Sequence, residues 1–215
     1  MIKRLGLYVT GVFVLGFGIV LNTRAGLGVG SINTFPYAMS QITPLSLGTC
    51  SMLLYFVYIA AQLVIYRKFD VKVLMQIPFS FIMGKIIDFY DQLLTFRPDF
   101  FPVKLLLLGI AIVSTAFGAY VMVTLDLVPN PADGMARAIG YALNKEFGQG
   151  KMIFDCVVVA ATAVFSLTFA HRIIGIGLGT VLSALFIGRM IQVFNRAIGP
   201  FLDQVMKDCS PSSLP

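Results

Sequence analysis

The chain has 215 residues, of which 58% are hydrophobic and 12% are charged. A soluble globular domain has about 45–50% apolar and about 25% charged residues, so this composition excludes a soluble domain and predicts an integral membrane protein. The formal net charge is +6, but the bases are scattered through short loops, which argues against a nucleic-acid partner.

Six segments are long and apolar enough to cross a bilayer core, which takes about 20 helical residues. They lie at about 5–22, 47–66, 73–94, 104–126, 152–170 and 173–195. With a cytoplasmic N-terminus, the C-terminus is also cytoplasmic, and ten bases fall inside against four outside, as the positive-inside rule requires. The inside bases are Lys3, Arg4, Arg67, Lys68, Lys72, Arg137, Lys145, Lys151, Arg196 and Lys207, and the outside bases are Arg24, Arg97, Lys104 and Arg172.

A glycine-rich break and a short helical piece near 31–43 follow the first segment. The piece begins at Ser31 and Asn33, is about half a membrane thick at 1.5 Å per residue, and ends at Thr43-Pro44. It is too short to span, so it either re-enters the membrane or lies on its surface. Its apolar composition favours re-entry.

The third segment contains the charges that are hardest to explain. Lys85, Asp88 and Gln92 share one helix face because they are three and four residues apart, and Asp91 is adjacent. Lys85 lies about 18 Å into the segment at 1.5 Å per residue, just past the middle of a core of about 30 Å. A charge there costs about 2.5–3.5 kcal/mol on insertion scales. Lys85 and Asp88 can neutralise each other, or the face can bind a solute.

From about residue 101 the same features return in the same order. A shift of 100 residues pairs Phe17-Gly18 with Phe117-Gly118, Gly48 with Gly148 and Ala60-Ala61 with Ala160-Ala161, and a shift of 104 pairs the closing stretch 84–93 with 188–197. This predicts an N-terminal repeat at 1–100, a C-terminal repeat at 101–200 and a cytoplasmic tail at 201–215. Three spans in each repeat place the copies in opposite orientations, as in many transporters.

The second short helix is expected near 131–145, after Pro129-Asn130-Pro131, with Asn130 or Asp133 as its N-cap. Its charges leave re-entrant and surface positions equally open. Asp155 lies early in the fifth segment. It either relays protons or cations, or pairs with Arg189 or Lys85 as a structural contact.

In the last segment the acids of the first repeat are replaced by amides. Arg189, Gln192 and Asn195 occupy the positions of Lys85, Asp88 and Asp91, so this face has uncompensated positive charge. Its bases need an acid from the first repeat, a lipid phosphate or a bound anion, unless they snorkel to the headgroups.

Three glycine-containing motifs resemble the YitT/YczE-like family of small bacterial integral membrane proteins. They are Ala25-Gly26-Leu27-Gly28-Val29, Pro131-Ala132-Asp133-Gly134, and Gly175-Ile176-Gly177-Leu178-Gly179-Thr180 with Gly188. The resemblance covers nearly the whole chain. It implies a bacterial inner-membrane location and transfers no catalytic residue, since that family has no settled activity.

We therefore expect an all-α polytopic membrane protein with six transmembrane helices, two short half-helices and two inverted three-helix repeats. The favoured function is a small transporter or facilitator for an anionic or carboxylate-bearing solute bound between the repeats. The predicted solute-binding residues are Lys85, Asp88, Asp91, Arg189, Gln192, Asn195, Asn33, Ser31, Asn130, Asp133 and Arg24, with Asp88, Asp91 and Asp155 as proton or ion coupling residues.

Two alternatives use the same buried polar groups: a non-transporting adaptor or regulatory subunit, and a passive channel. A homodimer or a partner membrane protein is compatible with each. Enzymatic chemistry is not expected, because no Gly-x-Ser-x-Gly or comparable context surrounds a nucleophile. Cys50, Cys156 and Cys209 are far apart in sequence and His171 is the only histidine, so neither a metal nor a cofactor is expected.

Overall fold

The computed structural model describes residues 2–68 and 70–208, which form helices joined by short loops. The helices are α1 (Ile2–Ala25), η1 (Ser31–Asn33), α2 (Thr34–Ile42), α3 (Leu47–Tyr66), α4 (Val71–Leu74), α5 (Gln76–Leu93), α6 (Phe101–Leu125), α7 (Pro131–Ala142), α8 (Phe147–Ala170) and α9 (Leu178–Asp208). Within the described residues, six stretches are long and apolar enough to cross a membrane. The prediction of an all-α polytopic membrane protein is confirmed.

Two helix boundaries differ from those expected from hydropathy. Helix α8 begins at Phe147, ahead of the predicted start at 152, so Lys151 lies in a helix instead of a loop. Helix α9 begins at Leu178 because Gly175 has a φ of +78°, a left-handed conformation that interrupts the apolar run.

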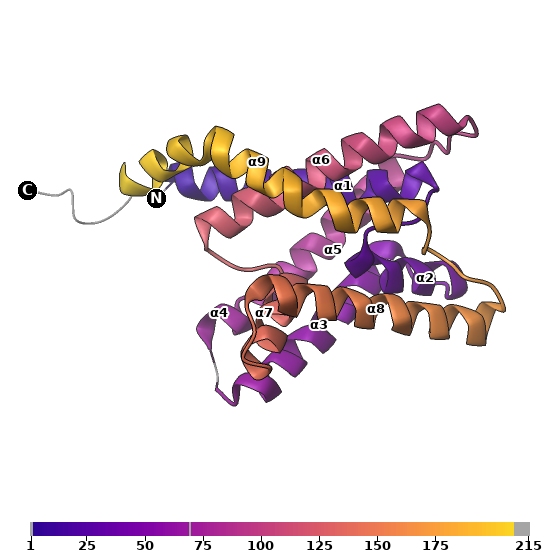
Figure 1. Ribbon diagram of the computed structural model, residues 1–215, viewed down its shortest axis with the longest axis horizontal. Helices are drawn as coiled ribbons and strands as arrows, with labels where there is room; N and C mark the ends of the chain where they lie inside the picture. Colours follow the sequence, from indigo (N-terminus) through magenta and orange to yellow (C-terminus); the bar gives the residue numbers. More distant parts are fainter. Residues whose placement is uncertain (1, 69, 209–215) are drawn as a thin grey trace, which may run out of the picture.

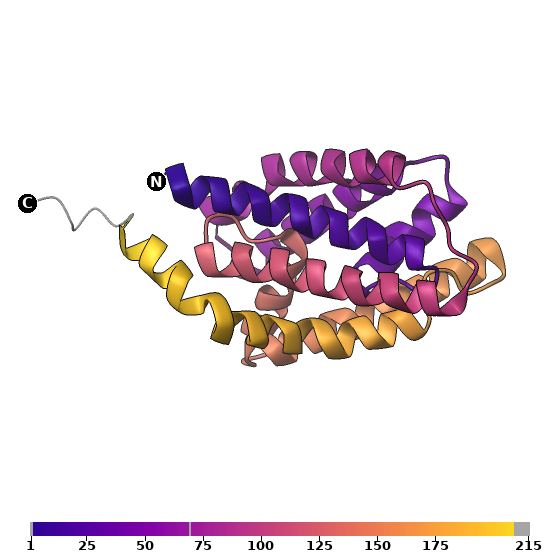
Figure 2. The same ribbon diagram turned by 90° about the horizontal axis from the view of Figure 1, so that it is seen from above.

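Helix α9 also extends further than predicted, through Pro200 to Asp208, into the segment expected to be a tail. A proline inside a helix removes one backbone hydrogen bond and favours a bend, and Figure 2 shows that α9 is curved. Residues 209–215, including Cys209, lie outside the described residues.

Helices α1 and α6 pack side by side in opposite directions (Figures 1 and 2). Glycines allow the close approach. A Cβ added at Gly18 would lie 2.6 Å from the backbone nitrogen of Thr115, and one at Gly118 would lie 2.6 Å from that of Leu15. The 100-residue shift relates Gly18 to Gly118 and Leu15 to Thr115, so the contact is reciprocal.

The short helices lie inside the bundle. Figure 1 shows the chain returning to the middle of the molecule after α1 and after α6, so that α2 and α7 start centrally and run outward to opposite ends. Helix α2 packs on α3 and α8, and α7 packs on the same two helices. The Thr34 hydroxyl lies 2.8 Å from that of Thr162, and the Gln62 amide donates to the Pro131 carbonyl at 3.2 Å. Both breaks therefore enter the interior, where each short helix contacts the other half of the chain.

Candidate functional site

Polar side chains from four segments meet where the two short helices begin. We call them the central cluster: Ser31 at the start of η1, Asn130 and Asp133 at the start of α7, Tyr55 and Tyr58 on α3, and Lys151 and Asp155 on α8. Helices α3 and α8 start at opposite ends of the molecule (Figure 1), and side chains of the two helices meet here. The rings of Tyr58 and Phe154 are edge to face with centroids 5.0 Å apart.

Asp155 lies at the centre of this cluster. It is eight residues into α8, about 12 Å at 1.5 Å per residue, and faces Ser31 from one short helix and Asp133 from the other. Helix N-termini present free N–H groups and partial positive charge, which stabilise a carboxylate. Its Oδ1 atom is buried and has no hydrogen-bond partner in the described part of the chain.

The cluster contains one ion pair and one additional acid. Lys151 Nζ lies 3.2 Å from Asp133 Oδ1, and the exposed fractions of the two side chains are 31% and 14%. The charges of Lys151 and Asp133 cancel, so the carboxylate of Asp155 gives the central cluster a formal net charge of −1. The fully charged cluster therefore attracts cations and repels anions.

The tyrosine hydroxyls provide further unpaired polar atoms. Tyr55 and Tyr58 are buried; the Tyr55 hydroxyl faces Asn130 without a hydrogen bond of good geometry, and the Tyr58 hydroxyl has no hydrogen-bond partner among residues 2–68 and 70–208. Buried polar groups are normally paired, so these hydroxyls are available to water, a proton carrier or a solute. A separate cavity of about 10 Å³, room for about one water molecule, is lined by Asn130, Asp133 and Arg137 but not by either tyrosine or Asp155.

Three predicted residues at the breaks are buried, and one of them is a helix cap. Ser31, Asn33 and Asn130 are all buried. The Asn130 Oδ1 atom accepts a hydrogen bond from the Ala132 nitrogen at 3.2 Å, which caps α7. Asn33 ends η1 beside Gly30 and Ser183.

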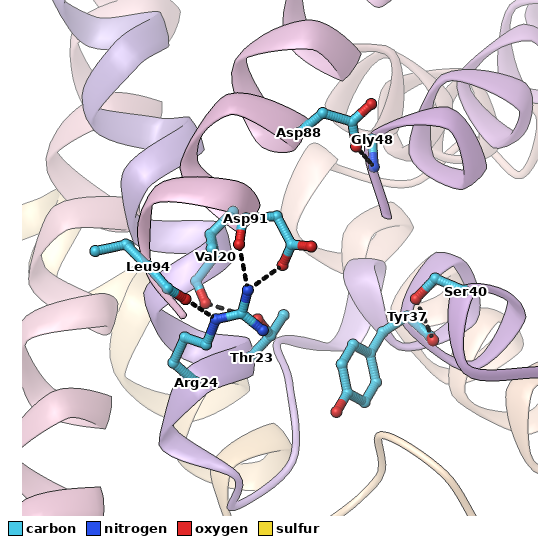
Figure 3. A network of polar contacts seen from close by, with 9 residues as sticks. All are labelled: Val20, Thr23, Arg24, Tyr37, Ser40, Gly48, Asp88, Asp91 and Leu94. Carbon is cyan, nitrogen blue, oxygen red and sulfur yellow. Dashed lines mark hydrogen bonds and ion pairs between the residues drawn. The ribbon is translucent and has the colours of Figure 1, made fainter. Parts of the chain in front are cut away.

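Asp88, predicted to bind solute or couple ions, instead caps a neighbouring helix. Its Oδ1 accepts from the Gly48 nitrogen at 2.7 Å, and its Oδ2 accepts from the Ser46 hydroxyl at 2.9 Å. These contacts satisfy the start of α3, and Figure 3 shows the one to Gly48. Asp88 therefore joins α5 to α3 and is separate from the central cluster.

Arg24 and Asp91 form a clamp between the ends of α1 and α5 (Figure 3). An Arg24 nitrogen lies 2.6 Å from Asp91 Oδ1 and donates at 2.6 Å to the Asp91 carbonyl, while Nε donates to the carbonyl of Leu94. The Arg24 side chain is 10% exposed. These two predicted site residues satisfy each other.

The remaining predicted residues face outward. Lys85, Arg189, Gln192 and Asn195 are all exposed. Lys85 lies in an open apolar groove of about 450 Å³ between α1 and α5, and the Arg189 guanidinium lies 5.9 Å from the centre of the Phe186 ring. The structure does not bring Lys85 and Arg189 together between the halves, because the faces of α5 and α9 that hold them turn away from the central cluster.

Sequence reasoning missed Lys151 and gave no role to Tyr58. Lys151 precedes Asp155 by four residues, and Tyr58 follows Tyr55 by three, so each pair shares a helix face. That spacing was the available signal. Among the described residues, no three His, Cys, Asp or Glu side chains gather as a metal site would require.

Comparison with known proteins identifies one family. The sequence pattern of DUF6198, a family of unknown function, matches residues 2–196 of the chain. No curated protein and no solved structure matches it.

Proposed function

We propose that this chain, which belongs to the DUF6198 family of unknown function, is a small transporter of the bacterial inner membrane built from two inverted three-span repeats. The shared order of helices and the reciprocal contacts of Gly18 and Gly118 support the inverted repeat. Short helices that begin at the centre of the membrane are the arrangement in which many transporters bind their solutes.

The proposal rests on Asp155, a carboxylate between two helix starts with one buried oxygen unpaired among the described residues. The helix starts that would attract an anionic solute already face the carboxylates of Asp133 and Asp155. A further anion would be repelled by the remaining charge. The central cluster therefore favours a small cation over the anionic solute expected from Lys85 and Arg189.

Asp155 is also the best candidate for proton coupling. Asp88 caps α3 and Asp91 pairs with Arg24, so both have structural partners. The groups that face Asp155 are Lys151 on its own helix, Asp133 on α7, Ser31 on η1 and Tyr58 on α3. Binding of a proton or a cation to Asp155 would neutralise the cluster, which is the exchange that a coupled carrier needs.

The test is uptake into proteoliposomes with an imposed pH gradient, using methylammonium as the cationic probe and acetate as the anionic probe. Uptake is counted above that of protein-free liposomes, because neutral methylamine and acetic acid cross lipid without a carrier. We expect methylammonium uptake that depends on the gradient and is lost in Asp155→Asn. Lys85→Ala and Arg189→Ala should retain uptake, because both side chains lie outside the central cluster. Both are matched controls, since each also removes one charge from a membrane helix.

Acetate uptake that survives in Asp155→Asn and falls in Lys85→Ala would contradict the cation assignment. It would instead support an anionic solute bound by Lys85 of α5 and Arg189 of α9.

The second candidate function is a membrane adaptor or regulatory subunit. It is supported by the small cavity at Asn130 and Asp133 and by the wide exposed faces of α8 and α9. In that case neither probe is taken up, and the protein co-purifies with another membrane protein.

A further inference from the structure

The two halves differ at one helix pair. In the first half, α5 packs on both α1 and α3. In the second half, α9 packs on α6 but, over the described residues, makes no comparable contact with α8. The spans in α8 and α9 are 22% and 17% buried, against 39% and 44% for the spans containing α3 and α5.

The contact between α3 and α5 depends on two glycines. A Cβ added at Gly48 would lie 2.0 Å from the carbonyl oxygen of Gly84, and one at Gly84 would lie 2.9 Å from that of Gly48. Next to them, a Cβ at Gly84 would also lie 3.2 Å from the Met52 Cβ, and the rings of Phe56 and Phe81 pack with centroids 5.2 Å apart. The helices can approach this closely only because both positions lack a side chain.

The second half repeats these positions but does not use them. A shift of 100 residues relates positions 48, 52 and 56 of α3 to 148, 152 and 156 of α8, and a shift of 104 relates positions 81, 84 and 88 of α5 to 185, 188 and 192 of α9. We call these six counterparts the α8–α9 face: Gly148, Met152, Cys156, Leu185, Gly188 and Gln192. Both glycines and the methionine are retained. All six residues are exposed, and a Cβ at Gly148 or Gly188 would meet nothing within 4 Å.

The polar groups are also complementary. In the first half, the Ser46 hydroxyl donates to Asp88 at 2.9 Å. The counterparts are Glu146, at the N-cap of α8, and Gln192, both exposed. An amide on α9 can donate to a carboxylate on α8, so the same link forms with donor and acceptor exchanged.

We infer that two helix pairs gate the central cluster: α3 and α5 form a gate that is closed in this structure, and α8 and α9 form a gate that is open. When α3 and α5 separate, α9 closes onto α8 through the α8–α9 face. The inference rests on the proposed transport function. Helices α3 and α8 start at opposite ends of the molecule (Figure 1), so the two gates face opposite sides of the membrane. Exchange of their states gives alternating access to Asp155.

Bridging of two thiols in lipid nanodiscs tests this closure without a known solute. Cys50→Ala and Cys209→Ala leave native Cys156 on α8, to which Leu185→Cys is added. The matched control adds Val193→Cys instead. Leu185 and Val193 are 52% and 53% exposed. Their counterparts differ, because Phe81 packs on Phe56 across the closed pair, whereas Phe89 packs on Tyr90 of its own helix. A short bis-maleimide is added, and intact mass distinguishes one bridging reagent from two separate adducts.

We expect Cys156 to bridge to Leu185→Cys at least about tenfold faster than to Val193→Cys, because thiols that meet have a raised effective concentration. Adding Gly188→Leu should abolish this preference, since a side chain there prevents close approach. Gly109→Leu should leave it unchanged, because Gly109 is exposed and open in α6.

Equal rates for the two pairs, or bridging between two copies of the chain, would overturn the inference. The bridged Leu185→Cys protein should also lose methylammonium uptake, whereas the Val193→Cys protein keeps it. Methylammonium uptake without preferential bridging refutes the gate and leaves the transport function standing. Preferential bridging with no uptake by the unmodified protein refutes the transport function and leaves the closure of α9 standing.

Discussion

At the scale of single residues, the charges in the membrane spans are in three different situations. Arg24 and Asp91 satisfy each other, and Asp88 satisfies a helix start. Lys85 and Arg189 lie on exposed faces, where long apolar stems let a charge reach towards the headgroups. Asp155 keeps one buried oxygen unpaired among the described residues. The first situation stabilises the fold, whereas the third suits a group that exchanges a ligand.

Arg24→Ala should destabilise the fold, because it removes one partner of a partly buried ion pair and leaves two carbonyls without their donor. The expected loss is on the order of 2 kcal/mol, measured by SDS-induced unfolding in mixed micelles. Asp91→Asn should cost less, since Arg24 keeps the carbonyls of Asp91 and Leu94. The exposed Arg172 provides the control, as Arg172→Ala should leave the unfolding midpoint unchanged. An equally unchanged midpoint in Arg24→Ala would exclude the clamp.

At the scale of helices, glycines determine which pairs are in close contact. Helices α1 and α6 meet at Gly18 and Gly118, and α3 and α5 meet at Gly48 and Gly84. Between apolar helices in lipid, packing and hydrogen bonds replace the hydrophobic driving force. Positions without a side chain therefore decide where backbones can touch.

Gly118→Ala should weaken the contact between α1 and α6. The added Cβ would lie 2.6 Å from the Leu15 nitrogen and 2.7 Å from the Gly11 carbonyl, so the helices must separate, at a cost of about 1–3 kcal/mol. Gly109→Ala on the same helix meets no atom within 4 Å and should not destabilise. The same unfolding titration compares them, and equal midpoints would show that the close approach is not required.

At the scale of the molecule, the start of α1 and the described end of α9 lie at the same end (Figures 1 and 2). A chain with an even number of membrane-spanning helices has both of its ends on the same side. The first half is closed between α3 and α5, while the second is open between α8 and α9. The proposed alternating access depends on this difference between the two halves.

The distribution of bases between the loops predicts the orientation in the membrane. Alkaline phosphatase fused after Asp99 should be active, because the loop between α5 and α6 is expected outside. The same enzyme fused after Lys68 should be inactive, because the basic loop between α3 and α4 is expected inside. A green fluorescent protein at the C-terminus should fluoresce. The reverse pattern of phosphatase activity would invert the assignment.

The sequence by itself determined the membrane class, the candidate spans and the two short helices, because hydrophobic length and Gly/Pro breaks are local properties. It could not determine which face of each helix turns inward. In helices that are apolar all round, spacing shows that Lys85 and Asp88 share a face but not what that face meets. Only the tertiary structure decided that Asp88 caps α3, that Lys85 faces outward, and that Asp155 lies near Ser31, Asp133 and Tyr58. These neighbours come from segments far apart in the chain, and their meeting depends on how all the helices pack together.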